Sequence, residues 1–426
     1  MVRRATLLHS FHVRHYEEVL EMSTSRFARF VVPPILLVSL LTLLTVSVST
    51  LVPRNSVIGA ESASPKVLTV HEWGTFTSVT GADGQALRWR PLTVESDVPS
   101  FVHSIDKRSS WGGLRHQSKS GMAVRVRMET PVIYFYSDEH VQVSVKVDFR
   151  GGKITEWFPM ASKVGGERLE WNDIEIIPLL HTNLPHDARE SHYYPARETD
   201  AAVLQVRSDP KVIEHEKFLF YRGVGDFSLP VTVQLIDNNL TIKDPLKANV
   251  KKVIIFENRD GHIGYQIREL HDGELTVERP SLDGKLEPLL EDLKAMLIAE
   301  GLFRKEAEAM LQTWRNSWFE PGLRVFYIMP REATDQILPI DINPEPEKLE
   351  RVLVGRAEII TSEMERDVTK QIAKLEDTSA VVRKTARSEI FKYGRFLEPL
   401  LAQISKHSHD ARVKAGVEKL FNEMPR

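Results

Sequence analysis

One stretch of the sequence gathers side chains that could bind a metal. His181, His186 and His192, together with Asp187 and Glu190, lie within 12 residues. Imidazoles and carboxylates are ligands for zinc and other divalent ions. However, spacings of five and six residues do not place the three histidines on one helical face, and no known metal motif is present. A divalent-metal site therefore competes with an ordinary polar surface loop, and we expect the polar loop.

A second candidate site is the adjacent pair His71 and Glu72. A histidine can act as a base oriented by a glutamate only if both side chains point into the same pocket. Neighbouring residues on a strand point to opposite faces. We therefore expect a β-strand that separates the pair, with Trp73 in the core and Gly74 at a β-bulge.

Glu216 and Arg222 form a third candidate site, on either side of the apolar run Phe218–Tyr221. An even spacing of six residues places both side chains on one face of a strand. We expect a structural ion pair between them. None of the three patterns identifies a catalytic residue, so the sequence does not identify a reaction.

The composition limits the chemistry. The chain has 426 residues, of which 42% are hydrophobic and 27% charged, and it contains no cysteine. These values exclude a disordered chain and a protein with many membrane spans. The absence of cysteine excludes disulfides, thiol nucleophiles and iron–sulfur clusters. No cofactor is predicted other than the divalent metal considered above.

The longest apolar run, residues 30–52, contains no charged residue and follows Arg26 and Arg29. At 1.5 Å per residue a helix of this length crosses a bilayer core of about 30 Å. The run is either an uncleaved anchor in the inner membrane, with a cytoplasmic segment 1–29, or the core of a signal peptide. Both alternatives predict that the rest of the chain is extracytoplasmic, either membrane-anchored or secreted into the periplasm.

Charge is distributed unevenly beyond this run. Residues 61–366 contain 38 basic and 48 acidic residues, whereas residues 367–426 contain 12 basic and 8 acidic residues. A body with a net charge of −10 argues against nucleic acid as a partner.

A period of two residues dominates residues 66–279, and strand character returns at 323–329 and 351–360, which predicts a β-rich domain over residues 66–360. Val141–Val147 alternates strictly, and similar short runs follow between turn signals. We expect an antiparallel, β-sandwich-like body. Leucines at helical spacing predict a helical hairpin over 284–318 that is inserted in this domain.

The tail, residues 362–426, has helical periodicity. Arg383 and Ala386 recur as Arg412 and Ala415, 29 residues later. The tail resembles HEAT-like repeats, and such repeats need about three units to bury a continuous core. We therefore expect the tail either to dock on the β body or to bind a protein partner through residues 367–426.

Four segments carry a second resemblance: His71–Val79, Met128–Tyr136, Glu216–Gly225 and Ser317–Arg324. Through them the exported part of the chain resembles a group of uncharacterised exported bacterial proteins of the planctomycete type. This resemblance implies export, and it carries no activity.

Three functions remain open. An exported binding or structural module explains the strands and the interaction-like tail, and it is the function that we expect. A metal- or carboxylate-dependent hydrolase is the first alternative. An assembly scaffold that acts through the helical tail is the second.

Overall fold

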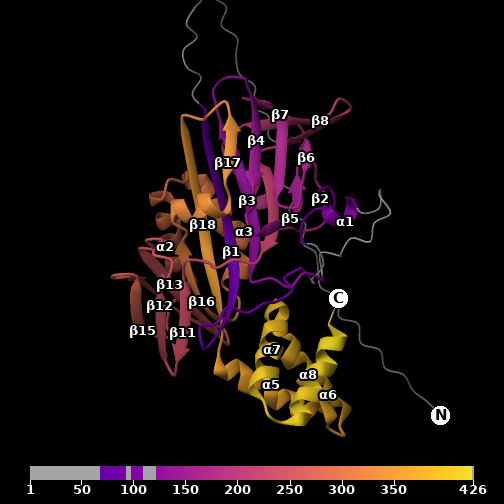
Figure 1. Cartoon of the computed structure of the whole chain (residues 1–426), viewed down its shortest axis with the longest axis vertical. Coiled ribbons are helices and arrows are strands. Elements are labelled where there is room, and N and C mark those ends of the chain that lie inside the picture. Colours follow the sequence, from indigo (N-terminus) through magenta and orange to yellow (C-terminus); the bar gives the residue numbers. More distant parts are fainter. Residues whose placement is uncertain (1–67, 93–96, 109–120, 425–426) are drawn as a thin grey trace, which may run out of the picture. The chain divides into compact units, whose positions relative to one another are not determined.

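Three β-sheets account for the runs of alternating residues (Figure 1). The structure is a computed structural model of the chain, and it describes residues 68–92, 97–108 and 121–424. The expectation of a mainly β body with antiparallel sheets and C-terminal helices is confirmed.

The largest sheet has nine strands. All neighbouring strands are antiparallel except β1 and β18, which pair in parallel although they lie at opposite ends of the body sequence. The strand order is β14 (His262–Glu269), β13 (Lys252–Arg259), β16 (Gly322–Ile328), β18 (Lys348–Ile360), β1 (Thr69–Gly81), β3 (Val126–Tyr136), β10 (Leu219–Gly225), β5 (Gly152–Phe158) and β2 (His103–Ser104).

Two smaller antiparallel sheets complete the strand structure. In the six-stranded sheet the order is β17 (Ile340–Asn343), β4 (Val141–Asp148), β7 (Arg168–Ile177), β8 (Val203–Asp209) and β9 (Val212–Glu216), and β6 (Lys163–Val164) pairs with β7. In the three-stranded sheet the order is β11 (Thr232–Ile236), β12 (Asn239–Lys243) and β15 (Glu274–Glu278). β9 is therefore an end strand.

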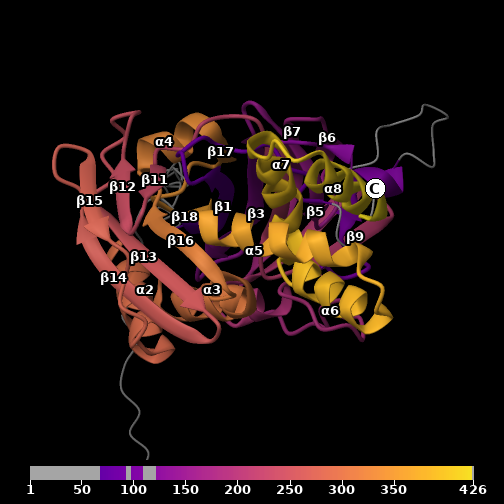
Figure 2. The ribbon, with the colours of Figure 1, turned by 90° about the horizontal axis from the view of Figure 1, so that it is seen from below.

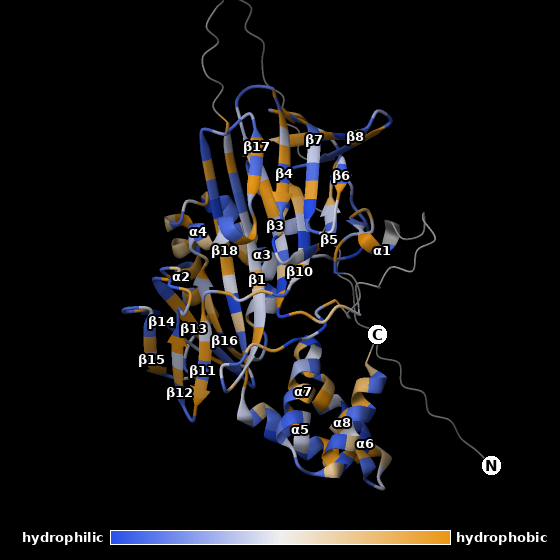
Figure 3. Cartoon of the chain, viewed as in Figure 1, coloured by the Kyte–Doolittle hydropathy of each residue, from blue (hydrophilic) through white to orange (hydrophobic). Residues whose placement is uncertain are grey.

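The nine-stranded sheet has a hydrophobic core on each face. One core lies between one face of this sheet and the two smaller sheets, which contribute, for example, Val143 of β4 and Trp171 of β7. Figure 3 shows the alternation of apolar and polar residues along these strands. The other core joins the opposite face to α2 (Leu286–Ala299) and α3 (Arg304–Trp318), which Figure 2 shows on the side away from β17 and β7. The nine-stranded sheet is thus the middle layer.

Helices α2 and α3 occur where the hairpin over 284–318 is predicted. Short helices α1 (Ile105–Arg108) and α4 (Arg331–Ile337), and the 3₁₀ turn η3 (Tyr194–Arg197), were not predicted by the sequence.

A bulge allows a proline in the middle of the large sheet. The sequence predicts that Glu129, Thr130 and Pro131 interrupt the strand, but β3 runs through them. Thr130 has a φ of 49°, and the register between β1 and β3 shifts at Gly74. A Cβ atom on Gly74 would lie 3.0 Å from the Cα atom of Pro131. A side chain at position 74 would crowd this proline, so the bulge predicted at Gly74 has a packing reason.

The tail forms four α-helices, α5 (Ser362–Ala373), α6 (Ala380–Phe391), α7 (Leu397–His407) and α8 (Ala411–Glu423), with the 3₁₀ turns η4 (Lys374–Glu376) and η5 (Gly394–Phe396). Their apolar residues share one core with Val79, Trp89 and Ile360 of the β body. Body and tail belong to one compact unit. The tail therefore docks on the body, and a protein partner for residues 367–426 stays a prediction.

The expectation of a membrane-spanning helix requires correction. Within the part of the chain that the structure describes, no helix has the length and apolar character needed to span a bilayer. The run 30–52 and the segment 1–29, on which the expectation rested, lie outside the described residues.

Candidate functional site

The three histidines of the predicted metal site lie in three different environments. His181 is exposed. His186 stacks on Tyr194 with ring centroids 4.4 Å apart. The Nδ1 atom of His192 lies 2.7 Å from the carbonyl oxygen of Thr313. Over residues 68–92, 97–108 and 121–424, no group of three histidine, aspartate or glutamate side chains is placed to hold a metal ion.

The two acidic residues of this loop also differ in their surroundings. Asp187 accepts hydrogen bonds from the backbone N–H groups of Ser100, at 2.6 Å, and Arg189, at 3.1 Å. The bond from Ser100 is the main cause that lowers the pKa of Asp187 to about 2. Glu190 is exposed. Asp187 therefore fixes the loop, and the loop is polar and structured.

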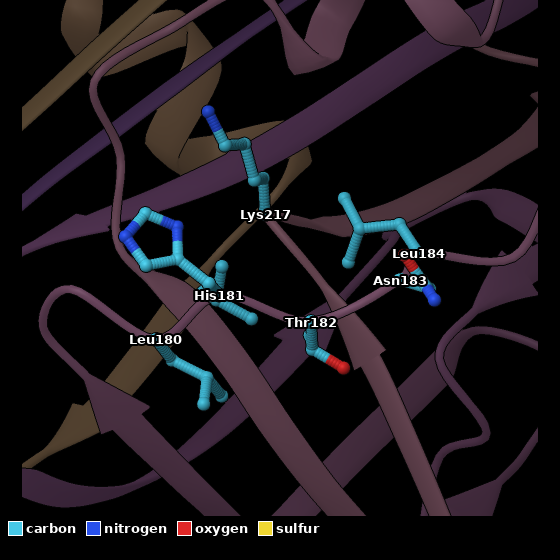
Figure 4. A pocket seen from close by; sticks show the side chains of 7 residues that line it. Leu180, His181, Thr182, Asn183, Leu184 and Lys217 are labelled. Atoms are coloured by element: carbon cyan, nitrogen blue, oxygen red, sulfur yellow. The ribbon is translucent and has the colours of Figure 1, made fainter.

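The start of this loop lines a hollow beside the first residue of β8 and the end of β9. The hollow has a volume of about 530 Å³ and is lined by Leu180, His181, Thr182, Asn183, Leu184, Val203 and Lys217. Figure 4 shows the side chains of His181 and Lys217 on one side and those of Asn183 and Leu184 on the other. This volume is within the range of small-ligand sites.

The polar side chains around the hollow are available for a ligand. Among the described residues, His181, Thr182 and Asn183 make no side-chain hydrogen bond. Lys217 donates one hydrogen bond to the carbonyl oxygen of Thr199, at 2.7 Å. An ammonium group has three protons, so two remain for another acceptor. The hollow therefore combines a cation with three uncommitted polar groups.

A buried ion pair supports the wall of the hollow. Glu216, adjacent to Lys217, is fully buried and lies 2.6 Å from Nη2 of Arg197. The same Nη2 atom donates to the carbonyl oxygen of Pro185, at 2.8 Å, which ties the loop to the sheet. Burial raises the pKa of Glu216 against the opposing effect of Arg197. Tyr193 donates a further hydrogen bond to Glu216, at 2.8 Å.

His71 and Glu72 point to opposite faces of β1, as the strand geometry predicts. His71 Nδ1 lies 2.8 Å from Glu306 Oε2 of α3. Glu72 accepts hydrogen bonds from Tyr221 on the other face and from Arg351 Nε, at 2.5 Å. The pair is split, and both side chains are fully buried.

The expected ion pair between Glu216 and Arg222 does not form. Glu216 ends β9 in the six-stranded sheet, whereas Arg222 lies on β10 in the nine-stranded sheet. Arg222 instead lies 2.6 Å from Asp97 and 3.1 Å from Glu156. The prediction assumed one continuous strand, but the chain crosses between sheets at Lys217 and Phe218.

Sequence reasoning found His181 but missed the rest of the hollow. Lys217 lies in the segment Glu216–Gly225, whose resemblance carries no activity, and its position depends on the pairing of β9 with β8. Thr182 and Asn183 are ordinary loop residues by composition. The only sequence signal for them was their place beside the histidines.

Comparison with protein-family models and with curated proteins gave no match. A function for this chain must therefore be inferred from the hollow and its surroundings.

Proposed function

We propose that this protein is a binding module, and that the hollow beside Lys217 binds a ligand that carries both a carboxylate and an apolar group. The observation that carries the proposal is the ammonium group of Lys217, which lines the same hollow as His181, Thr182 and Asn183, whose side chains have no hydrogen-bond partner among the described residues. Binding sites in proteins commonly combine an apolar lining with a few polar groups that fix orientation.

The lining favours an amphipathic ligand. Leu180, Leu184 and Val203 supply apolar surface, while Lys217 and His181 supply hydrogen-bond donors. A charge-assisted hydrogen bond between an ammonium group and a carboxylate is about twice as strong as a neutral one. A ligand with a carboxylate and a neighbouring aliphatic side chain matches both the polar and the apolar part of the lining.

N-acetyl-leucine and N-acetyl-leucinamide form a matched pair of probes for this proposal. They differ only in the carboxylate, so isothermal titration should detect binding of the acid and binding about tenfold weaker for the amide. Lys217→Gln should remove this difference. Lys211→Gln, an exposed lysine between β8 and β9, is the control and should retain it. Equal binding of acid and amide to the parent protein, or no binding of either, would overturn the proposal.

We also propose a finer description of the fold. The stacking of the large sheet on the two smaller ones supports a β-sandwich-type body. The packing of α5 on α6 and of α7 on α8 supports a HEAT-like tail of two helical pairs.

A further inference from the structure

We propose that the ligand of the hollow is the C-terminal end of an extended peptide, whose preceding residues add as a strand to the free edge of β9. This inference rests on the proposed function, because the terminal carboxylate of the peptide is the group placed beside Lys217.

The edge of β9 is open to a further strand. β9 is the last strand of the order β17-β4-β7-β8-β9. In the described ranges of the chain, the backbone of Val212–Glu216 makes hydrogen bonds to β8 and to no other segment. An end strand of this kind presents N–H and C=O groups that a peptide can pair with.

The position of the hollow fixes the direction of the peptide. β9 begins at Val212 and ends at Glu216, directly before Lys217 of the hollow. A peptide whose C-terminus lies in the hollow and whose preceding residues pair with β9 therefore runs parallel to β9. Five extended residues span about 16 Å, which matches the length of the strand.

The side chains of β9 alternate between two faces. Glu214 and Glu216 point inward, because they pair with Val206 and Leu204 of the first core. Ile213 and His215 therefore lie on the outer face. Alternate side chains of the peptide would lie beside these two residues, and its C-terminus would lie beside Lys217, which directly follows the strand.

The accessible groups along β9 are apolar or basic. Val212 and Ile213 are each 43% exposed, so they offer apolar surface along the free edge. Glu214 lies 3.0 Å from His103 and also accepts from the N–H group of Met160, and Glu216 is buried against Arg197. The two carboxylates of the strand are thus bound to other protein groups on the inner side. A peptide with a terminal carboxylate and an apolar residue four positions earlier complements this surface.

The test uses the pentapeptide acetyl-Val-Thr-Thr-Thr-Leu with a free C-terminus, titrated calorimetrically against the full chain. We expect it to bind at least tenfold more tightly than N-acetyl-leucine, and its C-terminal amide to bind about tenfold more weakly than the acid. N-methylation of alternate residues supplies a control within the peptide. Methyl groups on the residues whose N–H groups face β9 should abolish the gain over N-acetyl-leucine, and methyl groups on the other set should not.

A protein variant tests the same edge. Ile213→Thr keeps a strand-forming residue but removes the apolar contact, so it should weaken the pentapeptide about fivefold. Ile236→Thr on β11, at a residue 57% exposed, is the control and should not change binding. If the pentapeptide binds no more tightly than N-acetyl-leucine, or if both methylated sets bind equally, strand addition is wrong while the carboxylate site stands. If Lys217→Gln leaves N-acetyl-leucine binding unchanged, the proposed function itself is wrong.

Discussion

Arg395 donates a hydrogen bond to Glu129, a residue 266 positions earlier in the chain, at 3.2 Å. Its Nη2 atom also lies 2.8 Å from Oε1 of Glu320. Glu129 is 1% exposed and accepts a further hydrogen bond from Thr77, at 2.6 Å. A cation of η5 in the tail is thus held between two carboxylates of the β body. Ionic contacts therefore add to the apolar core that joins tail and body.

Replacing Arg395 should destabilise the protein. In Arg395→Met the buried carboxylate of Glu129 loses one of its partners, and removal of one member of a buried ion pair is strongly unfavourable. We expect the free energy of unfolding to fall by roughly 2–4 kcal/mol, measured by urea denaturation. Lys384→Met, an exposed residue of α6, is the control and should change it by less than about 0.5 kcal/mol. Equal effects of the two variants would contradict an ionic contribution to docking.

Lowering the pH should weaken the contact between Arg395 and Glu129. Burial alone would raise the pKa of Glu129, but the charges of Arg127, Arg395 and Arg356 outweigh it and hold the pKa below the ordinary 4.5. The contribution of a carboxylate with a lowered pKa is present above pH 4.5 and is lost as the pH falls through the folded-state pKa.

Urea denaturation between pH 7 and pH 3 tests this dependence. The free energy of unfolding of the parent should decrease below pH 4.5. That of Glu129→Gln should decrease less over the same range, so that the two curves of stability against pH converge. Glu190→Gln, an exposed loop residue, should give a curve parallel to the parent. A Glu129→Gln curve parallel to the parent would show that the carboxylate does not contribute.

Local periodicity predicted the elements of the fold but not their pairing. Strict alternation in Val141–Val147 gave β4, and leucines at helical spacing gave α2. The parallel pairing of β1 with β18 joins residues nearly 280 positions apart, and no local pattern specifies such a partner. The proline within β3 suggests a break in the sequence pattern, because the glycine that makes room for it, Gly74, lies on another strand.

The candidate site was predictable only where composition was unusual. The density of histidines marked the loop that contains His181. Lys217 could not be found in this way, because the run Val212–Glu216 has two apolar and three polar residues and was not recognised as a strand. Its pairing with β8, which creates the hollow, depends on contacts between distant parts of the chain.

Leu179 offers a test of strain in the loop beside the hollow. It is 91% exposed and has a φ of 59°, a left-handed conformation that disfavours a branched side chain. Leu179→Gly should therefore raise the free energy of unfolding by up to about 1 kcal/mol. The control, Leu246→Gly, changes a leucine 55% exposed that is not in the left-handed region, and it should lower stability by about 0.5–1 kcal/mol. Destabilisation by both variants would show that Leu179 makes contacts that outweigh its strain.

Trp89 should hold the tail on the body through apolar contact. Its side chain is 1% exposed, and its ring centroid lies 5.9 Å from that of Phe396. Trp89→Ala leaves a cavity in the shared core and should lower the free energy of unfolding by about 3–5 kcal/mol. Because the tail shares only one of the cores, we expect this loss to release the tail before the β body unfolds.

Hydrogen exchange can distinguish release of the tail from general destabilisation. In Trp89→Ala the amides of α5, α6, α7 and α8 should exchange faster, while those of β4 and β7 keep the parent rate. Trp171→Ala is the matched control, because Trp171 is fully buried in the core between the sheets. Its loss should accelerate amide exchange in β4 and β7 instead. If Trp89→Ala accelerates all regions equally, tail and body unfold as one cooperative unit. In that case the shared core and the Arg395 contact make the tail an integral part of the body.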